Sequence, residues 1–335
     1  GKKLLLIGHL DTVFEEDSPF QRWEPLGDGR VRGPGVDDMK GGDVSILLAL
    51  QALAAAGALD GTDIVVAFTG DEENPGHPIG ISRRDLIAAG RRADVALGFE
   101  GGVGSANSAT VARRGSSGWT LRVTGTTGHS SQVFSERYGS GAIFEAARIL
   151  HGFHERVRGE EYVTFNPGVI LGGTDVTYDE ARNRGVAFGK TNVIAATVVV
   201  DGGLRFLTEE QKERARAEMR EVVSRHLPGT SAEISFEDGY PAMPPTEGNL
   251  ALFEMFDAVS RDAGLGPVRA VDPGARGAAD ISFVAPYVDG LAGLGPFGDG
   301  AHTADETLEL ASIRSAAIKA ALLIYRLTRD DTLVP

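Results

Sequence analysis

Histidine and carboxylate side chains follow three short apolar runs in this sequence, each at the point where the run ends. The first run is followed by Gly8-His9-Leu10-Asp11, the second by Asp71-Glu72-Glu73 and the third by Glu100. Imidazole nitrogen and carboxylate oxygen together suit zinc, whose catalytic sites keep one position open for water. These residue types therefore predict a metal site that activates a water molecule.

Neighbouring side chains in these clusters suggest a division of roles. Asp11 lies two residues after His9, where it can reach back and orient the imidazole without binding the metal itself. In the adjacent pair Glu72 and Glu73, one carboxylate can bind a metal ion while the other stays free as a general base. An isolated acidic residue after a strand is often only a turn residue or a helix cap. The coincidence of three clusters favours a site.

The elements that must position these residues alternate along the chain. Residues 4–7, 64–68 and 95–99 have the length and apolar character of strands, and helical spacing recurs at about 42–57 and 80–90. This alternation predicts a parallel sheet of βαβ units. Open α/β sheets form their sites at the carboxyl ends of the strands, so the three clusters should converge at one edge.

The composition excludes several classes of function. The 335 residues include 33 basic and 47 acidic side chains, a formal net charge of −14. This charge would repel phosphate backbones and anionic lipid surfaces, so we expect neither nucleic acid nor a membrane as a partner. The chain has no cysteine, which excludes disulfides and thiolate chemistry and leaves only His, Asp and Glu as metal ligands.

A glycine-rich stretch at residues 33–42 opens directly into the first predicted helix. Such a loop at a helix start can cradle a phosphate, but this one lacks the Gly-Lys-Ser/Thr spacing of a phosphate-binding loop. An anion site is therefore the weaker interpretation of this stretch.

From about residue 111 the pattern changes to a second α/β layer. Its predicted strands lie at 119–123 and 195–200, and its predicted helices at 138–156 and 208–226. A proline-rich stretch at 239–245 is typical of a linker and would lead back to the first domain. Helical patterns resume after it at 247–263 and 306–328. We expect a catalytic domain in two parts, residues 1–110 and 238–335, with a smaller domain of residues 111–237 inserted between them.

Five motifs in order resemble those of the zinc peptidase family that includes carboxypeptidase G, aminoacylase, acetylornithine deacetylase and succinyl-diaminopimelate desuccinylase. They lie at residues 8–13, 35–42, 69–73, 99–102 and 300–303. The resemblance spans nearly the whole chain. One such motif alone is weak, whereas five in order at similar separations are specific. The resemblance implies a mixed, mostly parallel sheet flanked by helices in the catalytic domain, and a ferredoxin-like α+β lid.

The resemblance also implies two zinc ions per chain, for which Co²⁺ or Mn²⁺ could substitute. Asp38 would bridge the ions, His9 and Glu100 would complete one site, and Glu73 and His302 the other. Around them, Glu72 would be the base, Asp11 would orient His9, and Glu306 would support the loop of His302. Two close metal ions lower the pKa of a shared water and stabilise charge on the attacking oxygen and on the scissile carbonyl.

In this family the lid often forms the dimer contact, so the resemblance implies a homodimer through residues 111–237. Residues 125–131, Gly-Thr-Thr-Gly-His-Ser-Ser, resemble the lid motif whose histidine reaches the partner's active site to stabilise the oxyanion. His129 would have that role in trans, although a structural histidine in a turn is an alternative. Asn192 resembles the lid asparagine that contacts substrate.

The chain departs from carboxypeptidase G at Tyr240, where that enzyme has an arginine that grips the substrate carboxylate. Glutamate-type specificity therefore does not carry over. Arg276 is a candidate replacement, because a guanidinium can hold a carboxylate through two hydrogen bonds; an ordinary surface arginine is the alternative.

The predicted function is hydrolysis of an amide bond in a dipeptide or N-acyl amino acid. Two-metal phosphoester hydrolysis is one alternative, but it usually requires basic residues near the site. The other alternative is a non-catalytic relative that serves as a binding or assembly module, which should have lost ligands or the base. The expected compartment is the cytoplasm or, if a leader was removed before Gly1, the periplasm or the exterior.

Overall fold

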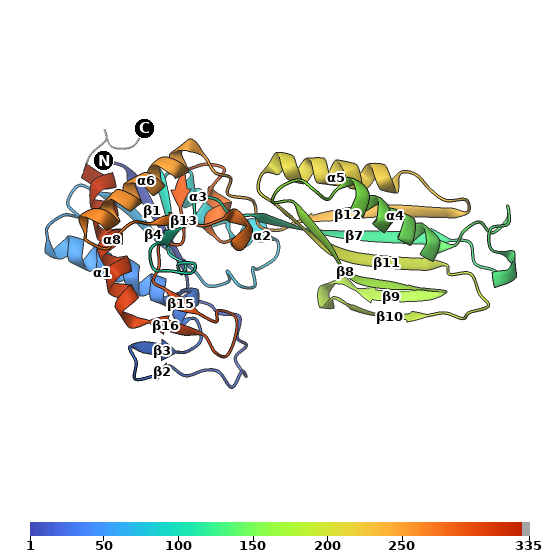
Figure 1. Ribbon diagram of the computed structural model, residues 1–335, viewed down its shortest axis with the longest axis horizontal. Coiled ribbons are helices and arrows are strands. Elements are labelled where there is room, and N and C mark those ends of the chain that lie inside the picture. Colours follow the sequence, from blue (N-terminus) through green and yellow to red (C-terminus); the bar gives the residue numbers. More distant parts are fainter. Residues whose placement is uncertain (330–335) are drawn as a thin grey trace. The chain divides into compact units, whose positions relative to one another are not determined.

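A computed structural model of the protein describes residues 1–329 (Figure 1). The chain forms two compact units. The first contains Gly1–Arg113 and the chain from Ala242 onward, and the second is Arg114–Pro241. The predicted insertion, residues 111–237, begins and ends a few residues earlier than the second unit.

The first unit is built on a four-stranded sheet in the order β14-β5-β1-β4. Its strands are β1 (Lys3–His9), β4 (Asp63–Thr69), β5 (Val95–Gly98) and β14 (Gly290–Leu291), and all of its pairs are parallel. The central strand β1 is buried along almost its whole length, which explains its continuous apolar run. The predicted α/β class with a parallel sheet is confirmed.

The register of this sheet brings the polar clusters to one edge. His9 of β1 pairs with Thr69, the last residue of β4, and Ile7 pairs with Gly98, the last residue of β5. The segments that leave β4 and β5, which carry Glu72, Glu73 and Glu100, therefore begin beside the segment that leaves β1.

The helices of the first unit follow the predicted pattern with one interruption. They are α1 (Gly41–Ala55), α2 (Ile79–Ser82), α3 (Arg84–Gly90), α6 (Glu247–Asp262), α7 (Ile281–Val284) and α8 (Leu310–Arg329). The single helix predicted at 80–90 is divided into α2 and α3 at Arg83, whose side chain is drawn into the interior. None of the helices within residues 1–329 is both long and apolar enough to cross a bilayer.

Two smaller sheets complete this unit. One has the order β15-β16-β3-β2 and is antiparallel, with strands β2 (Glu24–Pro25), β3 (Arg30–Arg32), β15 (Gly298–Asp299) and β16 (Thr307–Glu309). The other pairs β6 (Ser108–Ala109) with β13 (Arg269–Ala270). Because β3 pairs with β16, the glycine-rich loop that follows β3 lies near the loop of His302, which precedes β16. The glycine-rich loop ends in a helical turn at Val36–Lys40.

The second unit has the βαββαβ order of a ferredoxin-like fold. Its antiparallel sheet has the order β12-β7-β11-β8, and α4 (Ala142–Arg156) and α5 (Glu209–Val223) cover one face (Figure 1). The strands are β7 (Gly115–Gly125), β8 (Thr164–Gly173), β11 (Thr197–Phe206) and β12 (Thr230–Asp238). Alternate residues of β7 are buried, and Trp119 meets Phe153 of α4 edge to face.

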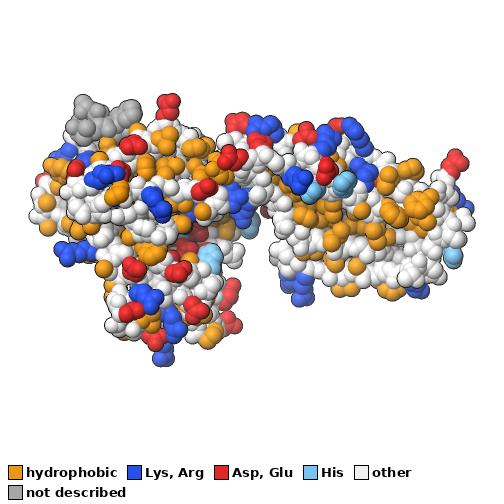
Figure 2. All heavy atoms as spheres, viewed as in Figure 1, with side chains coloured by type: hydrophobic (Ala, Val, Ile, Leu, Met, Phe, Trp, Pro, Cys, Tyr) orange, Lys and Arg blue, Asp and Glu red, His pale blue; other side chains and the backbone are white. Residues whose placement is uncertain are grey.

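Two features of the second unit were not expected from the sequence. A hairpin of β9 (Asp175–Asp179) and β10 (Arg184–Phe188) is inserted after β8. In addition, large apolar side chains are exposed on α4 and β8, namely Ile143, Phe144 and Ile170. Figure 2 shows apolar side chains gathered on the visible face of this unit.

Candidate metal centre

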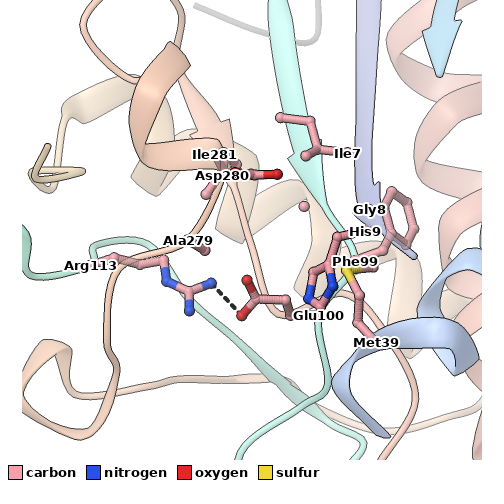
Figure 3. A pocket seen from close by; sticks show the side chains of 11 residues that line it. Ile7, Gly8, His9, Met39, Phe99, Glu100, Arg113, Ala279, Asp280 and Ile281 are labelled. Atoms are coloured by element: carbon pink, nitrogen blue, oxygen red, sulfur yellow. Dashed lines mark ion pairs between the residues drawn. The ribbon is translucent and has the colours of Figure 1, made fainter. Parts of the chain in front are cut away.

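His9 and Glu100 lie where β1 and β5 end, and both line a small pocket (Figure 3). One Glu100 oxygen, Oε2, lies 2.7 Å from Arg113 Nη1 and accepts a hydrogen bond of 2.8 Å from Arg276 Nη2. The Arg113 Nη1 contact is an ion pair without hydrogen-bond alignment. Two guanidinium groups thus hold one predicted metal ligand.

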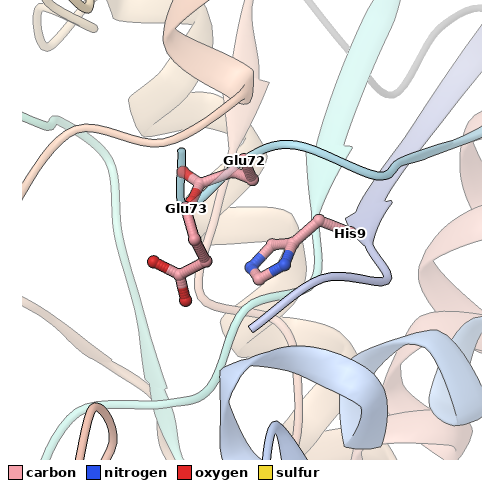
Figure 4. Close-up of side chains that lie close together, drawn as sticks. All are labelled: His9, Glu72 and Glu73. Atoms are coloured by element: carbon pink, nitrogen blue, oxygen red, sulfur yellow. The ribbon is translucent and has the colours of Figure 1, made fainter. Parts of the chain in front are cut away.

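The turn after β4 brings two more carboxylates to His9. Donor atoms of His9, Glu72 and Glu73 all lie within 4.8 Å of one another (Figure 4). A second group with the same spacing consists of Asp38, Glu73 and His302. Glu73 belongs to both groups, and Glu100 belongs to neither.

Asp38 lies between the two predicted histidine ligands. Its Oδ1 is 3.2 Å from His9 Nε2, and its Oδ2 is 3.1 Å from His302 Nε2. His302 Nε2 is also 3.4 Å from Glu73 Oε2. The carboxylate that was predicted to bridge two ions therefore presents one oxygen to each imidazole.

Asp11 supports this cluster in two ways. Its Oδ1 is 3.4 Å from His9 Nδ1, too long for a good hydrogen bond, so the predicted orienting role stays a prediction. Its carboxylate also accepts hydrogen bonds from the backbone amides of Glu72, at 3.1 Å, and Glu73, at 2.9 Å. One side chain thus links the histidine to the turn that carries both glutamates.

Glu306 supports a different loop from the one expected. Its buried carboxylate accepts hydrogen bonds from the amides of Gly35, Asp37 and Asp38, at 2.8 to 3.0 Å. Gly35 has a φ of 72°, a left-handed conformation that glycine adopts without strain. The carboxylate therefore holds the loop of Asp38, while only the Glu306 backbone amide contacts the His302 loop, at Thr303 O.

Burial, together with the charges of neighbouring side chains, governs the protonation of the cluster. Burial, reinforced by the charge of Glu100, raises the pKa of Glu72 to about 8. Burial and the charge of Asp38 raise the pKa of Glu73 to about 7. For His9, burial opposes the charged form, but the hydrogen bond and charge of Asp38 outweigh it and raise the pKa to about 10. The hydrogen bond to Asp38 also raises the pKa of His302, to about 9.

The cluster therefore fits metal ions by its chemistry. Without a metal, protons bind where carboxylates and imidazoles converge, and a cation can replace those protons. Two imidazoles with several carboxylates form a nitrogen and oxygen donor set that zinc accepts. His9, Asp38, Glu73 and His302 could hold ions directly. Glu100 lines a pocket together with His9, and its Oε2 faces the two arginines.

The two predicted lid residues lie together in the second unit. His129 pairs with Val193 in an antiparallel bridge, and the amide of Ser130 donates to the carbonyl of Asn192. Both His129 and Asn192 are exposed, and His129 Nδ1 is 2.8 Å from Ser131 Oγ. Neither side chain is committed to the core of its unit.

Three buried charged residues that contact the cluster or its turns were missed by sequence reasoning, namely Arg83, Arg113 and Asp280. Arg113 is buried, and its Nε and Nη2 donate to the carbonyls of Gly277 and Ala278. Most arginines in helices and strands are exposed, so the sequence does not indicate that Arg83 and Arg113 are buried. Asp280 lies four residues after Arg276, the residue of this segment that sequence reasoning singled out.

Comparison with known proteins shows the family to which the chain belongs. The model of peptidase family M20/M25/M40 matches residues 5–326. The chain belongs to this family. Among curated members, carboxypeptidase G2 of Pseudomonas sp. (strain RS-16) is 26% identical over 337 residues, which cover 98% of this chain and 74% of that protein. Succinyl-diaminopimelate desuccinylase of Acidovorax ebreus (strain TPSY) is 27% identical over 345 residues, covering 98% and 80%.

Solved structures share the fold of this family member. Aminopeptidase PepT from Bacillus cereus ATCC 10987 superposes with a TM-score of 0.76 at 19% identity, covering 98% of this chain and 81% of that chain. Bacillus subtilis YxeP, described as a dinuclear metal-binding peptidase of family M20, has a TM-score of 0.68 at 15% identity, covering 98% and 82%. The predicted family is confirmed, and the protein is a hydrolase of amide bonds.

Proposed function

We propose that the protein is a two-zinc hydrolase that cleaves an amide bond in a dipeptide or an N-acyl amino acid. The observation that carries this proposal is the position of Asp38, with one oxygen facing His9 and the other facing His302. Relatives named as a carboxypeptidase and a desuccinylase support the substrate class. No observation within residues 1–329 favours the phosphoester or the non-catalytic alternative.

The ligand roles follow the donor groups. Asp38 would bridge, His9 and Glu100 would complete one zinc site, and Glu73 and His302 the other, with Co²⁺ or Mn²⁺ as possible substitutes. Two bound ions supply a lowered water pKa and a polarised substrate carbonyl.

Glu72 is the proposed general base. Asp11 accepts a hydrogen bond from the Glu72 amide and so holds its turn, and burial raises the pKa of the Glu72 carboxyl to about 8 in the metal-free protein. Glu72 takes a proton from water as the water oxygen bonds to the carbonyl carbon. It then gives that proton to the nitrogen as the C–N bond breaks, so the amine leaves neutral.

Arg276 and Asn192 are the proposed substrate contacts. The Arg276 side chain lies against Glu100 and remains 17% exposed, so part of its guanidinium can meet a ligand. Arg276 and Arg113 both hold Glu100, and the charges of Asp37 and Asp38 also act on Arg276. The exposed part of the Arg276 side chain supports a substrate that carries a carboxylate, the group that guanidinium recognises best.

A homodimer through the second unit, with His129 acting in trans, completes the proposal. The exposed apolar side chains of α4 and β8 supply a surface whose burial would stabilise such a contact. A positioned imidazole can stabilise an oxyanion, and loss of such a donor costs about 100-fold in turnover or more. Mixing His129→Ala with Glu72→Gln, after confirmed subunit exchange, should restore part of the activity. No recovery would show that His129 does not act in trans.

The proposed function can be tested by a mass-spectrometric screen. Zinc-loaded protein is incubated with a mixed library of dipeptides and N-acyl amino acids, and Glu72→Gln is the matched control. We expect hydrolysis products with the natural protein alone, lost on chelation and restored by zinc. If no amide in the library is cleaved with zinc, cobalt or manganese present, the proposed substrate class is wrong.

A further inference from the structure

A fully buried arginine outside the metal cluster holds the turn that carries Glu72 and Glu73. Arg83 lies between α2 and α3 and has 0% of its side chain exposed. Its Nη1 donates to Asp71 Oδ1 at 2.6 Å, and its Nη2 donates to the Asp71 carbonyl at 2.7 Å. Both the side chain and the main chain of the residue before Glu72 are therefore fixed by one guanidinium.

The same guanidinium reaches a second buried carboxylate. Arg83 Nε donates to Asp280 Oδ1 at 2.7 Å, and Asp280 Oδ2 accepts a hydrogen bond from Thr69, the last residue of β4. Asp280 also ends the stretch that begins at Arg276. Arg83 thus joins the end of β4, the glutamate turn and the segment of the proposed substrate contact.

The turn is consequently held from two directions. Asp11 holds the amides of Glu72 and Glu73 from the end of β1, and Arg83 holds Asp71 from the helix side. Asp71 adds contacts of its own, because its Oδ2 accepts from the Gly76 amide and from Ser82 Oγ. With carboxylates on both sides of it, Arg83 is committed to these partners and does not offer its charge to a substrate.

The geometry points to Arg83 as a positioning residue for the reaction, which places the carboxylates of Glu72 and Glu73 through Asp71. This inference rests on the proposed function and assigns a role to a residue outside all five motifs. A planar guanidinium can serve three acceptors in fixed directions, which the ammonium of lysine cannot. Displacement of a catalytic group by about 1 Å can cost about 100-fold in rate.

The competing explanation is that Arg83 only balances the buried charge of Asp280. Arg83→Met leaves the buried charge of Asp280 without its cation and should lower the melting temperature by about 10 °C. The double variant Arg83→Met with Asp280→Asn removes both charges and should recover most of that loss. If Arg83 only balances charge, turnover will recover with stability.

We expect the opposite for turnover. In the double variant kcat should stay about 100-fold low, with KM within about threefold of the natural protein, because the base rather than the substrate contact is displaced. Arg83→Lys should not rescue kcat. Arg91→Met is the matched control, since Arg91 is an exposed arginine at the end of α3 that stacks on Tyr287, and it should leave kcat unchanged.

A milder variant keeps the test decisive if Arg83→Met fails to fold. Asp71→Ala leaves the Arg83–Asp280 pair in place, and Asp71 is 36% exposed, so this variant should fold. We expect kcat to fall about tenfold, and the zinc affinity of the site that uses Glu73, measured by competition with a chromophoric chelator, to fall about 10-fold to 100-fold.

The zinc measurement separates the two proposals, because it needs no substrate. If the natural protein cleaves no amide but Asp71→Ala weakens zinc, the proposed substrate is wrong and the positioning role stands. Recovery of kcat with stability in the double variant, or full kcat and unchanged zinc affinity in Asp71→Ala, would overturn the role of Arg83.

Discussion

Glu73 and Glu100 follow strands on either side of β1, and both were predicted as metal ligands, yet their surroundings differ. Glu73 faces His302, and burial together with the charge of Asp38 raises the pKa of its carboxyl. Glu100 faces two arginines. A sequence motif specifies the type of a ligand residue, whereas the residues around it decide whether its charge is already balanced by a cation. A metal ion beside Glu73 would relieve repulsion between carboxylates. A metal ion beside Glu100 would have to share that carboxylate with two arginines.

The largest effect should come from the base on the Glu73 side. Glu72→Gln should lower turnover by about 1000-fold, because the nearly isosteric amide cannot accept a proton. Zinc content, measured by elemental analysis after dialysis, should stay at two ions per chain, whereas Glu73→Gln should lose one. Equal zinc content in the two variants would contradict the division of roles within the pair.

Metal-free stability should separate the two sides directly. Glu100→Gln leaves two largely buried guanidinium groups without their carboxylate and should lower the melting temperature in chelator by about 10 °C. Glu73→Gln removes one of several repelling carboxylates and should raise the melting temperature at pH 8. If both variants shifted the melting temperature by the same amount, the different surroundings of Glu73 and Glu100 would not affect stability.

The two arginines on Glu100 should also differ from each other. Arg276 is partly exposed, so Arg276→Gln should raise KM about tenfold for substrates with a free carboxylate, a typical cost of one charged hydrogen bond. Matched amidated substrates serve as the control, and their KM should not change. Arg113→Gln should instead lower the melting temperature, since Arg113 is buried on backbone carbonyls. An equal rise in KM for both substrate forms would exclude recognition of the carboxylate by Arg276.

The smallest effect is a pH dependence of the metal-free protein. The folded-state pKa values of Glu72, Glu73 and Asp43 are raised to about 8, 7 and 7, chiefly by burial, and that of His9 is raised to about 10. Groups with raised pKa values contribute stability that is complete below their unfolded pKa and lost as pH rises through the folded pKa. Thermal melts in chelator should therefore show stability falling from about pH 5 to pH 9. In Glu73→Gln the slope should be shallower, and a slope of the opposite sign would contradict these shifts.

The sequence predicts the sheet and the glutamate turn well, because both depend on local patterns. The strand ending at His9 is a continuous apolar run, and acidic residues follow its neighbours where parallel strands end. In contrast, β8 carries Pro167 and several glycines, which hide a strand signal, and β9 and β10 are short and exposed.

Most of the supporting contacts could not be predicted, because they join residues far apart in the chain. Arg83 and Asp280 are 197 positions apart, and Arg113 reaches Gly277 across 164. The direction in which Glu306 points depends on the pairing of β3 with β16, which no local pattern specifies. In the sequence, Arg83 and Arg113 cannot be told apart from ordinary surface arginines.

The contact between Glu306 and the Asp38 amide spans 268 positions, so it bears on the order of events during synthesis. A ribosome that has completed the first unit's initial segment and the whole second unit has not yet made the carboxylate that holds the Asp38 loop, nor His302. The nascent chain therefore carries His9, Asp38, Glu73 and Glu100 before His302 exists, and the loop of Asp38 is not yet held by Glu306. Tight metal uptake becomes a property of the finished chain, and a truncation before residue 302 should emerge from the ribosome without it.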